Sequence, residues 1–362
     1  MLERVQQTAR EAVKAGHPAK QESSPAGRQA AFPQAHQVAL PHSVRFTRHM
    51  NPAFGAQLFA IVLLLMSSVP HARAQVPACF APATPRLQKI VDSAVAEVRQ
   101  QFPKLQANHI AITLVDLRDP AQPARGSHRG GEQIYPASVI KLFYLAAAHR
   151  WMEDGKLTDT PELRRAMSDM IVHSYNEATH YVLDLLTGTT SGPELPEAEL
   201  KVWFDQRNAV TRYFAGLGYR NVIAHKKPWG EGPYGRESQA IKAFEPKRNF
   251  LSTDDTARLL TDIVGSKCVS AQRSDEMMTL LKRTLPDTDP DPDAQSKFTG
   301  TALPAGAKLW SKAGWTSQTR HDCACVELAD GRKFVLVTFT EGHANERGIL
   351  HAVARKVVEE LK

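Results

Sequence analysis

Strand patterns stand at the two ends of the long C-terminal part of this 362-residue chain, and helical patterns fill the space between them. Near its start, "HIAITLVDL" (109–117) is apolar and β-branched, and "ARGSHRGGEQIY" (124–135) follows as a turn and a second strand. Three more strand patterns come near the end of the chain: "AKLWSKAGW", "HDCACVEL" and "KFVLVTFTE". We therefore expect both ends to meet in one five-stranded antiparallel sheet of an α+β fold.

The remaining segments have helical spacing. The amphipathic stretch 86–102 and a final helix over about 344–361 are expected to flank the sheet, which gives an α-β-α sandwich. The other predicted helices form an all-helical lobe: Ser138 to about Arg150, 160–173 with Thr160 as N-cap, 177–186, 196–215 and 252–264. A cleft between the sheet and the lobe is the natural place for a site.

The first 74 residues are typical of a targeting region. Residues 50–74, with basic residues just before them, hold an apolar run and end in small residues around Ala74, as a cleavable secretory signal does. The polar residues 1–49 are interpreted as a mis-called or disordered extension, and 75–362 as the functional domain. We expect a periplasmic or secreted protein, with an uncleaved inner-membrane anchor as the alternative.

The net charge of +7 does not indicate a nucleic-acid-binding protein. Residues 1–49 carry +4 and Arg73 another +1, which leaves only +2 on residues 75–362. The histidines show no metal-ligand spacing, so neither a metal nor an organic cofactor is expected. Free buried thiols, with one disulfide as an alternative, are the expected state of the four cysteines, Cys79, Cys268, Cys323 and Cys325.

The segment "YPASVIKLF" (135–143) places Lys141 one helical turn after Ser138 in apolar surroundings. Burial favours the neutral form of a lysine, and a neutral lysine beside a serine can act as its general base. A Ser-x-x-Lys motif alone is weak, since a surface lysine on an amphipathic helix gives the same pattern.

Two further motifs strengthen this interpretation. "HSYN" places Ser174 and Asn176 between two helices, where a hydroxyl could relay a proton and an amide could hold a substrate carbonyl. "SKAGW" places Lys312 and Gly314 on a strand, where the lysine could attract a carboxylate and the glycine lets substrate approach. The backbone N–H groups of Ser138 and Trp315 could then form an oxyanion hole.

The ordered set Ser-x-x-Lys, Ser-x-Asn and Lys-x-Gly resembles the serine β-lactamase and penicillin-binding-protein superfamily, and the chain looks closest to class A enzymes. The resemblance covers about residues 85–362. It implies an acylated Ser138 with Lys141 as its base or relay, Ser174 as proton donor to the leaving nitrogen, and substrate binding by Asn176 and Lys312. Arg320, or His321 beside it, would add positive charge near the substrate carboxylate.

Several residues depart from that pattern. Tyr175 stands where class A enzymes carry aspartate, which is closer to penicillin-binding proteins, and Ala313 replaces the hydroxyl residue of Lys-Thr-Gly. Thr316 or Ser317 could compensate for that hydroxyl. Instead of a Glu-x-x-Leu-Asn deacylation segment, the region 226–253 offers three candidate bases, Glu231, Glu237 and Glu245, of which Glu237 fits best by position.

These observations predict a monomeric serine hydrolase that opens a small β-lactam and thereby confers antibiotic resistance. The alternative is a D-Ala-D-Ala peptidase acting on peptidoglycan-derived substrates, or an esterase, with the same Ser/Lys mechanism. A non-catalytic cell-wall-binding module is the third hypothesis, and it predicts that Ser138→Ala leaves function intact.

Overall fold

The computed structural model describes residues 80–230, 232–285 and 288–362. The predicted extension 1–49, the predicted signal 50–74, Cys79 and Glu231 lie outside these residues. No helix in the described part of the chain is long and apolar enough to cross a membrane.

The two ends of the described chain meet in one antiparallel sheet, as predicted, with strand order β2-β1-β6-β5-β4-β3. β1 pairs along its whole length with β6, which joins the first part of the chain to the last. The strands are β1 Ile110–Asp116, β2 Ala124–His128, β3 Lys282–Arg283, β4 Lys308–Trp315, β5 Thr319–Glu327 and β6 Lys333–Glu341.

The sheet has six strands rather than the five expected. The additional strand, β3, consists of two basic residues that pair with Leu309 and Trp310 of β4. A two-residue polar strand has no alternation of apolar side chains, so nothing in its sequence could indicate it. Because β3 is so short, most of the outer edge of β4 has no partner strand among the described residues.

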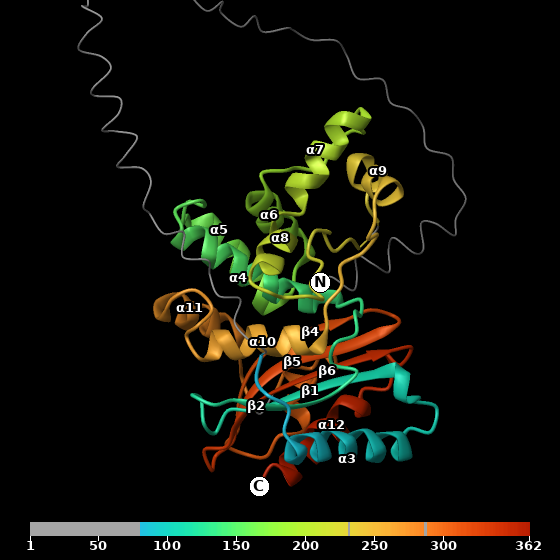
Figure 1. Ribbon diagram of the computed structural model, residues 1–362, viewed down its shortest axis with the longest axis vertical. Helices are drawn as coiled ribbons and strands as arrows, with labels where there is room; N and C mark the ends of the chain where they lie inside the picture. The colour runs from blue at the N-terminus through green and yellow to red at the C-terminus, as the bar shows by residue number, and fades with distance from the viewer. Residues whose placement is uncertain (1–79, 231, 286–287) are drawn as a thin grey trace, which may run out of the picture. The chain divides into compact units, whose positions relative to one another are not determined.

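Helices cover both faces of the sheet (Figure 1). On one face, α3 (Pro85–Gln101) and α12 (Gly348–Glu360) pack against each other and against strands β1, β2 and β6. On the other face, α10 (Thr253–Val264) contacts β1, β5 and β6. The expected α-β-α sandwich is therefore confirmed.

The central part of the chain forms the predicted helical lobe (Figure 1). Thr160 caps α5 by accepting a hydrogen bond from the backbone N–H of Leu163, as expected. The lobe comprises α4 Ile140–Glu153, α5 Pro161–Ser168, α6 Asn176–Thr187, α7 Glu197–Arg207, α8 Ala209–Gly216 and α9 Gly235–Ala243, while α11 Ala271–Leu281 follows α10.

The single helix predicted over 196–215 is wrong, because the chain breaks there into α7 and α8 at Asn208. The Asn208 amide donates to the Phe204 carbonyl and contacts a ring nitrogen of His225. A side chain that bonds local backbone competes with the helical ladder, which is why asparagine favours helix ends. The helices α9 and α11 were not predicted.

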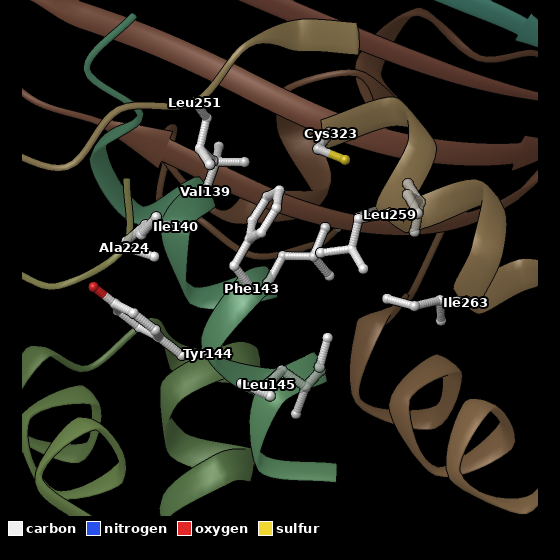
Figure 2. Close-up of a cluster of buried hydrophobic side chains, with 14 of the residues drawn as sticks. Val139, Ile140, Phe143, Tyr144, Leu145, Ala224, Leu251, Leu259, Ile263 and Cys323 are labelled. Atoms are coloured by element: carbon white, nitrogen blue, oxygen red, sulfur yellow. The ribbon is translucent and has the colours of Figure 1, made fainter. Parts of the chain in front are cut away.

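Helix α4 is buried on nearly every side between the sheet and the lobe (Figure 2). The Phe143 ring meets that of Phe214 edge to face with centroids 4.8 Å apart, and Leu259 and Cys323 belong to the same core cluster. Of the four cysteines, the three in the described part of the chain, Cys268, Cys323 and Cys325, are free thiols. This dense packing fixes the start of α4, where the Ser138 and Lys141 motif lies.

Candidate functional site

A cavity of about 750 Å³ lies between the outer edge of β4 and the turn that leads into α6. Its lining includes five of the predicted site residues: Ser138, Ser174, Asn176, Gly314 and Trp315. These residues lie up to 177 positions apart in sequence. Only the closure of the sheet by the C-terminal strands brings them together.

Ser138 lies in a single 3₁₀ turn, Ala137–Val139, that runs directly into α4. Ala137 has a φ of 46°, in the left-handed region that residues with a side chain rarely adopt. Such backbone strain persists only where the surrounding structure enforces it, and it gathers at functional sites. The strained turn presents the half-buried Ser138 to the cavity.

Lys141 is fully buried beneath the cavity. Its Nζ donates to the Ser174 carbonyl at 2.6 Å and to Asn176 Oδ1 at 2.8 Å, and it lies 3.3 Å from Ser174 Oγ. Burial lowers the pKa of Lys141 to about 7, while the charge of Glu177 opposes that shift. Near neutral pH a large share of this lysine is therefore unprotonated, as a general base must be.

Ser174 ends a π-helical turn (Asp169–His173) with φ 60° and ψ 30°, a left-handed conformation unusual for serine. This bend directs its hydroxyl between two lysines, 3.3 Å from Lys141 Nζ and 3.0 Å from Lys312 Nζ. A hydroxyl has one hydrogen and two lone pairs, so it can accept from one amine while donating to the other. The arrangement can carry a proton between the two amines.

Lys312 lies on β4 and is also fully buried. Burial lowers its pKa well below the usual value, and the positive charges of Lys141 and Arg283 lower it further, while Asp322 opposes them. Its Nζ donates to Gln295 Oε1 and to the Ala313 carbonyl, both at 2.6 Å. The predicted carboxylate-binding lysine therefore already has protein acceptors.

Gly314 lies in close contact with the Ser138 turn. A Cβ added at Gly314 would come within 2.7 Å of Ser138 N, 2.8 Å of Val139 N and 2.9 Å of the Pro136 carbonyl oxygen. Glycine is thus required so that β4 can approach the predicted nucleophile. The next residue, Trp315, is 51% exposed and lines the cavity, as does Tyr175, which is 55% exposed.

Three predicted binding groups are engaged elsewhere. The Arg320 guanidinium is buried and pairs with Asp293 at 2.8 Å, and the Thr316 hydroxyl is used within the β4–β5 turn. His321 is enclosed between the Tyr135 carbonyl and the Thr340 N–H, and burial lowers its pKa to about 4. A neutral His321 supplies no positive charge to a substrate at neutral pH.

Glu237, the predicted deacylation base, does not reach the cavity. It lies on α9, at the end of the lobe remote from the sheet (Figure 1). Its buried carboxylate accepts from Arg207 at 2.8 Å and from Ser191 at 2.9 Å, with Lys227 at 3.6 Å. Glu245, another of the three candidate bases, has a side chain that is 73% exposed.

Gln295 and Asp293 were not predicted from the sequence as residues of the site. Both line the cavity, and they end the acidic, proline-rich segment "PDTDPDPDAQ" (286–295), which has the composition of a solvated loop. The segment carries no periodicity and no motif, so no sequence signal places it against β4. In the described part of the chain, no group of three or more histidine, cysteine or acidic side chains is arranged to hold a metal ion.

Ser138 lies on a cavity beside an antiparallel sheet and a helical lobe, three residues before the fully buried Lys141, and this combination is typical of a serine hydrolase. The profile of the "Beta-lactamase enzyme family" matches residues 158–361, more than half of the chain, so the protein belongs to this family. The matched range includes Ser174 and Lys312 and begins after Lys141. Among curated protein sequences, no relative was detected.

Solved structures show the same fold at low sequence identity. PBP-A is 18% identical, with 74% of this chain and 96% of that chain covered and a TM-score of 0.53. A β-lactamase from Xanthomonas campestris is 14% identical, with coverages of 76% and 99% and a TM-score of 0.56. A β-lactamase from Sphaerobacter thermophilus is 19% identical, with coverages of 75% and 97% and a TM-score of 0.53.

Proposed function

We propose that this protein hydrolyses amides, β-lactam amides first among them, through an ester formed on Ser138. The observation that carries the proposal is the position of Ser174 Oγ, within hydrogen-bonding reach of both Lys141 Nζ and Lys312 Nζ at 3.3 and 3.0 Å. These contacts support Lys141 as the base and Ser174 as the proton relay to the leaving group.

In the acylation step, neutral Lys141 takes the hydroxyl proton of Ser138 as Oγ attacks the carbonyl carbon. Backbone N–H groups of Ser138 and Trp315 stabilise the oxyanion. The Ser174 hydroxyl gives its proton to the leaving nitrogen and recovers one from Lys141, so that the C–N bond breaks and Lys141 is neutral again. Water then attacks the ester, which releases the acid and restores the Ser138 hydroxyl.

Several similar structures carry names that support this substrate class. They include β-lactamases, and one is described as an acyl-enzyme complex of PBP-A with penicillin G. Action on such amides outside the cytoplasmic membrane accords with the secretory signal predicted over residues 50–74. The proposed chemistry needs no metal and no organic cofactor, and a single chain supplies all the groups it uses.

A second candidate is an enzyme of the penicillin-binding type, a peptidase or esterase whose β-lactam ester is long-lived. The observation that favours it is the position of the glutamates. Among the described residues, Glu237 is held by Arg207 and Lys227 and Glu245 is exposed, so neither lies where it could activate a water at Ser138.

The test uses residues 75–362 with a chromogenic cephalosporin, followed by absorbance and by intact mass. Continuous turnover that disappears in Ser138→Ala establishes a β-lactamase. One equivalent of product with a stable adduct on Ser138 establishes the penicillin-binding type. If neither colour nor adduct appears, and a fluorophosphonate does not label Ser138, the proposed acyl-enzyme is wrong and the wall-binding module is favoured.

A further inference from the structure

The outer edge of β4 is the wall of the cavity along which an extended substrate would lie. β3 pairs only with Leu309 and Trp310, and the Arg283 guanidinium then binds the Ser311 carbonyl at 2.6 Å. Backbone groups of alternate residues point the same way along a strand. Ser311, Ala313 and Trp315 therefore direct their N–H and C=O groups to this edge, away from β5.

The side chain of Gln295 occupies this edge. Its Oε1 accepts from Lys312 Nζ at 2.6 Å and from the Ala313 N–H at 3.2 Å. Its Nε2 donates to the carbonyls of Ile171 and Val172 at 2.9 and 2.8 Å. Since an amide has two N–H donors and two acceptor lone pairs, the bonding capacity of Gln295 is filled. The amide joins the two walls of the cavity.

The segment that carries Gln295 is also bound to the protein two residues earlier, at Asp293. The Asp293 carboxylate pairs with Arg320 at 2.8 Å and with Arg347 at 2.9 Å, and these two cations lower its pKa. The Arg320 side chain is only 3% exposed, and its guanidinium carbon lies 3.9 Å from the Phe298 ring centroid. Its charge is therefore balanced by Asp293 inside the protein rather than by solvent. Both positive charges predicted to attract a substrate carboxylate, Lys312 and Arg320, thus have partners from residues 293–295.

We propose that Gln295 determines substrate specificity by excluding a carboxylate from Lys312, so that the preferred acyl donors are uncharged beside the scissile bond. The Gln295 oxygen stands where a substrate carboxylate would accept from Lys312 Nζ and the Ala313 N–H. A carboxylate must displace four hydrogen bonds of Gln295 before it can bind, and it meets Asp291 and Asp293 on the cavity lining. An uncharged ester or amide needs only the Ser138 end of the cavity.

This inference rests on the proposed acyl-enzyme and is tested by comparing two forms of one probe. The probes are a chromogenic cephalosporin with its free carboxylate and the methyl ester of the same compound. The quantity measured is the second-order rate constant for acylation of Ser138, by colour and intact mass. We expect the wild-type protein to react about tenfold or more faster with the ester, the size that loss of hydrogen bonds to a charged group implies.

In Gln295→Ala the ratio of ester to acid rate constants is expected to fall about tenfold, because Lys312 becomes available. Asp293→Asn keeps Gln295 and releases Arg320, and it is expected to move the ratio in the same direction. The matched control is Gln318→Ala, an exposed glutamine on the β4–β5 turn, which should leave the ratio unchanged.

Two results would overturn the proposal: a wild-type protein that reacts as fast with the acid as with the ester, or a ratio that Gln295→Ala and Asp293→Asn both leave unchanged. Absence of any Ser138 adduct with a fluorophosphonate would remove the proposed function itself. The two failures are distinguishable, because a protein that is labelled by the fluorophosphonate but shows no charge preference contradicts only the role of Gln295.

Discussion

Lys312 Nζ lies 3.0 Å from Ser174 Oγ, although the two side chains come from opposite walls of the cavity, one from β4 and the other from the turn before α6. Lys141 reaches the same hydroxyl from below at 3.3 Å. Two buried amines that share one hydroxyl are costly, since burial and mutual repulsion both disfavour their charged forms.

The pH dependence of acylation should report the titration of Lys141. Only the neutral amine can accept the Ser138 proton, and burial lowers the pKa of Lys141 to about 7. The acylation rate is therefore expected to fall about tenfold per pH unit below this value and to level off above it. Lys141→Ala should lower the rate by about 10²- to 10⁴-fold. A profile that stays flat between pH 5 and 9 would exclude Lys141 as the base.

Two substitutions of Ser174 should distinguish the role of its hydroxyl in acylation from the effect of its backbone strain on stability. Ser174→Gly and Ser174→Ala both remove the hydroxyl, so both should lose acylation activity against an amide. Only glycine adopts the φ of 60° without penalty, so the glycine variant should be about 1 kcal/mol more stable than the alanine variant. Denaturant unfolding of the two proteins measures this difference. Equal stabilities would mean that the positive φ of residue 174 does not strain the backbone.

Glu237→Gln should lower the free energy of unfolding and leave the acylation rate unchanged. The change removes the buried carboxylate that Arg207 and Lys227 share, but both cations keep Asp184, at 3.0 and 2.7 Å, so the expected cost is about 1–3 kcal/mol. The acylation rate per folded molecule, counted by fluorophosphonate titration, should stay unchanged. Glu245→Gln, at an exposed carboxylate, is the control and should alter neither quantity. Loss of deacylation in folded Glu237→Gln would restore the catalytic interpretation of Glu237.

Gly314→Ala should abolish acylation by displacing the Ser138 turn. The added methyl group meets three backbone atoms between 2.7 and 2.9 Å away, none of which can rotate aside as a side chain would. Gly216→Ala serves as the control, because an added Cβ there finds open space and alanine is the better helix former. Near wild-type labelling of Ser138 in Gly314→Ala would mean that β4 need not approach the turn so closely.

Local signals in the sequence predicted most of the strands, several helices and the three motifs at the cavity. Short runs rich in apolar residues gave strands β1, β4, β5 and β6, because strands covered on both faces of a sheet are apolar along most of their length. The capping residue Thr160 marked the start of α5, since orphan N–H groups at a helix start need nearby acceptors. The motifs around Ser138, Ser174 and Lys312 identified the residues that meet at the cavity and the family to which the chain belongs.

Other features were decided only by the tertiary structure, because they depend on contacts between segments that carry no pattern of their own. The β3 strand exists only because β4 is beside it, and Glu237 is turned away from the cavity by Arg207 on another helix. Gln295 ends a segment with the composition of a solvated loop, yet its amide bonds Lys312 and the Val172 carbonyl. Local periodicity reports which face of an element is buried, whereas pairing between distant polar groups is settled only when the chain is folded.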